Sequence, residues 1–82
     1  MNPERLQMKG MLAESKKRFR TLDTEASGTI LIIRSLLNPY EEITNLDTDK
    51  VLVLSHRLNK IVQEMKELKE KIKKLELSLI HI

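Results

Sequence analysis

The chain has 82 residues, a net charge of +3, no cysteine, and a single Phe and a single Tyr as its aromatic residues. This length allows one domain with a small core, and a chain without cysteine has neither disulfides nor thiolate metal sites to support it. Close helix packing and self-association are the remaining routes to a stable fold, so we expect one all-α domain over residues 1–82.

The first predicted helix covers about residues 3–37. Asn2 can cap its start, and Pro3 suits the first helical position. An apolar or small residue then recurs every three or four positions, as in the seam of a coiled coil. These seam positions are Met8, Leu12, Ser15, Phe19, Leu22, Ala26, Thr29, Ile33 and Leu36. Gly28 costs about 1 kcal/mol against Ala, which predicts a bend near Gly28 or, as the alternative, two shorter helices.

A connection follows over about residues 38–46. The residue before a proline avoids the helical region and proline lacks an N–H, so Asn38 and Pro39 end the first helix. A short helical turn is expected directly after Pro39. Asp47 is the predicted N-cap of the second helix, where the helix dipole also favours Asp49. Helix capping is the first interpretation of residues 47–49, and a divalent-metal site is the alternative.

The second predicted helix covers about residues 47–79 and has the stronger pattern. Its seam positions are Val51, Leu54, Leu58, Ile61, Met65, Leu68, Ile72, Leu75, Leu79 and Ile82. The two seams match in antiparallel order, from Leu36 opposite Val51 to Met8 opposite Leu79. The sequence therefore predicts an antiparallel two-helix hairpin or coiled coil, with long helices over 3–37 and 47–79.

Charged residues beside the seam are less decisive about the pairing. In an antiparallel pair Glu25 could meet Arg57, Arg18 could meet Glu64 and Asp23 could meet Lys69. Arg18 could equally face Lys71, and parallel pairing of two copies of the second helix would also join opposite charges. A lone hairpin leaves several apolar side chains outside its seam, namely Ile30, Ile32, Leu37, Val53 and Val62. An uncovered apolar strip usually has a partner, so we expect self-association or a protein partner.

A catalytic or cofactor-binding pattern does not emerge from the sequence. It contains no Gly-rich phosphate loop, no Cys nucleophile and no metal-ligand spacing, and His56 and His81 lie far apart. Ser55 and His56 are neighbours, but adjacent side chains of a helix point about 100° apart, which excludes a Ser–His pair. We therefore expect no cofactor and no enzymatic activity.

The densest basic run is Lys16, Lys17, Arg18 and Arg20, around Phe19. A solvated helix face is the first interpretation, and weak contact with nucleic acid or anionic lipid is the alternative. No apolar stretch approaches the roughly 20 residues of a membrane span, and the N-terminus lacks the apolar region of a signal peptide, so a cytoplasmic location is expected. Residues 77–82, LSLIHI, are either a frayed apolar end or a non-native tail similar to translated adapter read-through.

Residues 34–62 carry a family resemblance. An arginine in the first helix, Arg34, is followed by a short loop and by a pentapeptide on the second helix, Ser55-His56-Arg57-Leu58-Asn59. The arrangement resembles the small helical-hairpin aspartyl-phosphate phosphatases that act on sporulation response regulators, whose second helix carries Ser-Gln-Glu-Leu-Asp. Ser55 and Leu58 match that motif, whereas Asn59 stands in place of its aspartate, and Pro39 falls where the family's first helix continues. The resemblance implies a phosphatase-like regulator of sporulation.

Taken together, the patterns predict a non-catalytic coiled-coil hairpin that serves as a protein–protein interaction or assembly module. The phosphatase-like regulator and the weak nucleic-acid binder are the alternatives. The residues expected to make the contacts are Ile30, Ile33, Leu36, Leu37, Leu54, Leu58, Ile61, Met65, Leu68, Ile72 and Leu75.

Overall fold

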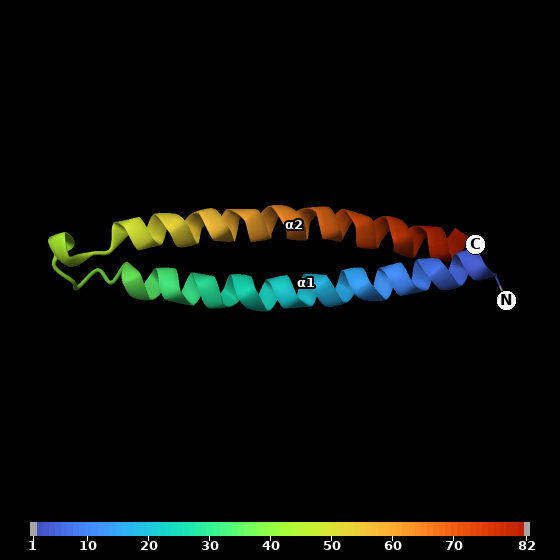
Figure 1. The fold of residues 1–82 in the computed structure, drawn as a ribbon, viewed down its shortest axis with the longest axis horizontal. Coiled ribbons are helices and arrows are strands. Elements are labelled where there is room, and N and C mark those ends of the chain that lie inside the picture. Colours follow the sequence, from blue (N-terminus) through green and yellow to red (C-terminus); the bar gives the residue numbers. More distant parts are fainter. Residues whose placement is uncertain (1, 82) are drawn as a thin grey trace.

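The computed structural model describes residues 2–81 as two long antiparallel helices (Figure 1). Helix α1 covers Pro3–Leu36, helix α2 covers Thr48–His81, and a short 3-10 helix, η1, covers Ile43–Asn45 in the connection between them. The hairpin measures 64 × 15 × 14 Å. The predicted all-α two-helix hairpin is confirmed. The predicted start of the first helix agrees with the observed one, and the other three helix ends differ by one or two residues.

Side-chain caps begin both helices as predicted. The Asn2 Oδ1 accepts a hydrogen bond of 3.0 Å from the backbone N–H of Glu4, and the Asp47 Oδ1 accepts one of 3.1 Å from the backbone N–H of Lys50. Each bond satisfies an N–H group that the helix itself leaves unpaired. Asp47 thus serves as a helix cap.

Helix α1 runs through Gly28 without interruption. The alternative of two shorter helices is therefore wrong, and Figure 1 shows no sharp bend at this point. Packing explains the continuity. Ala26 and Thr29, on either side of Gly28, are both buried against α2, and such tertiary packing offsets the roughly 1 kcal/mol that a glycine costs in a helix.

The connection differs from its prediction in one detail. The Asn38 side chain accepts a hydrogen bond of 3.0 Å from the N–H of Tyr40, and the Asn38 carbonyl accepts one of 3.2 Å from Glu41. These bonds make a turn around Pro39 rather than a helix. The short helical segment falls later, at Ile43–Asn45.

The core of the hairpin is a single row of side chains between the helices. Its buried apolar members are Leu22, Ala26 and Ile61, with exposed fractions of 2%, 8% and 6%. Ser15 and Thr29 are buried as well, because the small seam residues of α1 stand opposite large ones of α2. The other predicted seam positions within residues 2–81 are half-buried. The seam position predicted for Ile82 lies outside the described residues.

Two leucines of α1, one inside the seam and one outside it, should contribute unequally to the free energy of unfolding. Leu22→Ala removes a buried side chain from the core and should lower the free energy of unfolding by about 2–4 kcal/mol. Leu6→Ala is the matched control, because Leu6 is 56% exposed and its replacement should change that free energy by less than about 0.5 kcal/mol. Urea unfolding followed by circular dichroism measures both. Equal losses would contradict the seam.

Candidate functional site

The side chains beside the seam divide the hairpin into two broad faces. On the first face, Arg18 Nε lies 2.7 Å from Glu64 Oε2, and Arg57 forms an ion pair with Glu25. Both pairs were predicted from the antiparallel register. Arg18 meets Glu64 rather than Lys71, the other residue that it could have faced.

The second face has a different pattern of pairing. Lys16 Nζ lies 3.1 Å from Glu76 Oε1, a contact that the sequence prediction missed. The predicted pair of Asp23 with Lys69 is not among the ion pairs within residues 2–81. The pairs Lys16–Glu76 and Asp23–Lys69 occupy equivalent positions beside the seam. The register alone therefore does not decide which of these two pairs forms.

The Arg18–Glu64 contact shifts the ionisation of both partners. The hydrogen bond from Arg18 holds the pKa of Glu64 below its ordinary value, against the opposing effect of desolvation and with some help from the positive charge of Arg18. The same hydrogen bond and the carboxylate charge raise the pKa of Arg18. Both groups therefore stay charged at neutral pH, and the pair can fix the register of the two helices.

The second face is strongly basic, and we call it the basic face. It comprises the helix positions on the Lys16–Glu76 side of the seam. Its basic residues are Lys9, Lys16, Arg20, Arg34, Lys66, Lys69 and Lys73. Its acidic residues are Asp23 and Glu76. The first face is nearly balanced, with six basic and five acidic residues, so the positive charge is segregated to one side.

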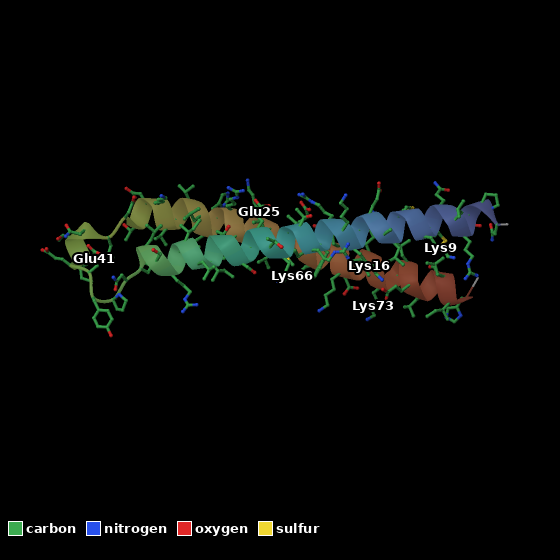
Figure 2. All side chains as sticks on the ribbon, turned by 90° about the horizontal axis from the view of Figure 1, so that it is seen from below. Lys9, Lys16, Glu25, Glu41, Lys66 and Lys73 are labelled. Carbon is green, nitrogen blue, oxygen red and sulfur yellow. The ribbon has the colours of Figure 1, made fainter. Side chains whose placement is uncertain are left out.

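An apolar groove lies on the basic face, between the two helices. Phe19, Val62 and Met65 line it together with Lys66 and Lys69, and its volume is about 210 Å³. The three apolar residues are half-buried. Figure 2 shows Lys66 and Lys73 along one edge of the hairpin and Glu25 along the opposite edge.

A second apolar feature surrounds the hairpin where the helices meet the connection. We call it the loop-end belt, and its members are Ile30, Leu31, Ile32, Leu37, Leu52 and Val53. Each exposes between 43% and 69% of its surface. Consecutive residues of a helix point about 100° apart, so the run Ile30–Ile32 presents apolar side chains in several directions. The belt extends the uncovered strip that the sequence predicted.

A wider hollow, of about 610 Å³, lies on the outer side of α2 and reaches Met11 of α1. Its walls are Met11, Gln63, Lys66, Glu67, Glu70, Lys71, Lys74 and Leu75. Most of these are long, exposed Lys, Glu and Gln side chains. Such walls change shape with side-chain rotamers, and they offer a ligand little fixed geometry.

The residues of the phosphatase-like motif do not converge on one point. Leu58 is half-buried in the seam, and Arg57 forms its ion pair with Glu25. Ser55, His56 and Asn59 are exposed. The phosphatase resemblance stays a prediction.

The basic run of α1 also separates in the structure. Lys16 and Arg18 form ion pairs with α2 on opposite faces of the hairpin, while Lys17 and Arg20 are exposed. These four cations therefore do not form a single patch. The wider basic face, which draws on both helices, was not visible as a motif because its residues are spread along the chain.

Acidification provides a test of the Arg18–Glu64 pair. A carboxylate whose pKa is lowered in the folded state adds stability above its ordinary pKa of 4.5, and loses that contribution as the pH falls through the folded value. Glu64→Gln should therefore be less stable than the parent at pH 7, and the difference should shrink below pH 4.5. Urea unfolding across this range measures it. Glu67→Gln is the control, because Glu67 belongs to none of the ion pairs above. Parallel pH profiles of the parent and Glu64→Gln would contradict the prediction.

Three further observations concern membrane spans, metal ions and similarity to known proteins. No helix within residues 2–81 has both the length and the apolar character that crossing a membrane requires. Among the same residues, no group of three or more His, Asp or Glu side chains is placed to hold a metal ion. Searches against protein-family models, curated proteins and solved structures found no match to the chain.

Proposed function

We propose that the chain is a non-catalytic helical hairpin that assembles with another protein chain, either a second copy or a different protein. The observation that carries this proposal is the loop-end belt. A helix segment that is apolar all round is normally buried, yet α2 covers only one side of the run Ile30–Ile33. The exposed fractions of Leu31 and Val53, 63% and 69%, leave most of those side chains for a partner.

The charge distribution supports the same proposal. Assembly interfaces combine an apolar centre with a polar rim, and the belt lies next to such a rim. Glu41 in the connection, Asp49 in the first turn of α2 and Arg34 in the last turn of α1 are all exposed. Charged groups placed in this way give a partner an orientation as well as an apolar contact.

Loss of the belt should abolish assembly without unfolding the hairpin. The test variant is the triple replacement Leu31→Ser, Leu52→Ser and Val53→Ser. The matched control replaces three equally exposed apolar residues at the opposite end of the hairpin, Leu6→Ser, Leu77→Ser and Ile80→Ser. Light scattering measures the mass of each purified chain, and affinity capture from cells of the native host with quantitative mass spectrometry measures bound proteins.

We expect the parent and the control to retain a dimer or a captured protein that the loop-end variant loses. Circular dichroism should show the same helix content in all three chains, since the replaced residues lie outside the seam. A monomeric parent that captures no protein sensitive to the loop-end variant would refute the proposal.

The phosphatase alternative has its own assay. Asn59 carries a neutral amide where the resembling family has a carboxylate, so the parent should not accelerate the loss of phosphate from an aspartyl-phosphate receiver domain. Asn59→Asp supplies the missing carboxylate and tests whether the rest of the motif is competent. Release of phosphate by the parent would overturn the non-catalytic assignment.

A further inference from the structure

We infer that the basic face binds an acidic amphipathic helix, which lies along the groove between α1 and α2 as a third helix. This inference rests on the proposed function, because it names a kind of protein partner for the hairpin. The centre of this surface, the groove lined by Phe19, Val62 and Met65, lies outside the loop-end belt, although the two surfaces share Ile30 and Leu37.

The groove has the size and the lining for a side chain of such a helix. Its volume of about 210 Å³ is smaller than the roughly 300–1,000 Å³ of small-molecule pockets. Phe19, Val62 and Met65 form an apolar floor, half-buried between the helices. A leucine or isoleucine of a partner can therefore insert there and displace water from apolar surface on both chains.

The apolar surface continues from the groove along the same face. In the antiparallel register Ile30 of α1 stands beside Val62 of α2, and Leu37 follows two turns further, about 10 Å along the helix axis. Ile30 and Leu37 are 43% and 45% exposed. A partner helix meets such a line with residues spaced by three, four and seven positions, the usual pattern of a helix bound in a groove.

Charge selects the partner. The basic face holds seven basic residues and two acidic ones, and Glu76 is already paired with Lys16. Lys66 and Lys69 stand at the rim of the groove itself. Two copies of this face would bring like charges together, so a second copy of the chain is a poor occupant. Glu and Asp residues flanking the apolar stripe of a partner helix complement these lysines.

The aliphatic lining of the groove favours a helix over an anionic membrane or a nucleic acid. Phe19, Val62 and Met65 are half-buried and share the groove with Lys66 and Lys69, so the headgroups of an anionic membrane would pair with the ammonium groups and leave the apolar lining uncovered. A nucleic acid would pair with the lysines, but its phosphates gain nothing from an aliphatic groove. Of these three partners, only an acidic amphipathic helix contacts both the apolar lining of the groove and the lysines beside it.

The experiment measures binding of a synthetic three-heptad peptide with Leu at its a and d positions, Glu at most other positions and a fluorescein label, by fluorescence anisotropy. The test variant is Lys66→Glu with Lys69→Glu. The matched control is Lys60→Glu with Lys74→Glu, which makes the same charge change on the first face. A peptide with Lys in place of Glu, a DNA duplex and phosphatidylserine vesicles serve as competing ligands.

We expect the parent to bind the acidic peptide, the test variant to bind it at least about tenfold more weakly, and the control variant to lose less than about threefold. Val62→Ser should also weaken binding, and the lysine peptide should not bind. Equal losses in the two charge-reversal variants, no binding of the acidic peptide, or tighter binding of DNA or vesicles than of the peptide would each overturn the inference. Failure here, with capture through the loop-end belt intact, would leave the proposed function standing.

Discussion

A single seam between two helices holds this molecule together, because each helix has only one neighbour. Leu22, Ala26 and Ile61 are the buried apolar residues of that seam within residues 2–81, and most other side chains face solvent. The seam also buries two polar side chains, Ser15 and Thr29, and the rest of the polar residues lie on the surfaces of the hairpin. The two broad faces differ in charge and in apolar character.

The two broad faces of the hairpin differ in how many of their charged residues form ion pairs between the helices. The first face joins its own charges across the helices, through Arg18 with Glu64 and Glu25 with Arg57. Within the described part of the chain, the basic face has one such pair, Lys16 with Glu76, while its other basic residues surround an apolar groove outside any ion pair. The two faces therefore differ both in net charge and in ion pairing.

Heptad periodicity was sufficient to predict the fold. The spacing of apolar residues placed Leu22 and Ile61 in the seam, and the matching order of the two seams predicted the antiparallel pairing. The turn at Asn38 was less predictable, because it depends on hydrogen bonds of one side chain with nearby backbone. The basic face required both helix registers at once, since its residues form two groups, one on α1 and one on α2, that are far apart in sequence. The sequence contains no periodic pattern that indicates function as the heptads indicate the fold, and the weak motif at Ser55–Asn59 does not indicate one either.

The start of α1 and the end of α2 lie side by side, at the far end of the molecule from the connection (Figure 1). Tension applied through those two ends would load the outermost seam residues first and separate the helices one level at a time. Hairpins pulled in this direction open by peeling, which needs less force than sliding the same two helices past each other. At that end the outermost seam residues, Met8 and Leu79, are only half-buried, so the seam is weakest where such tension would first act.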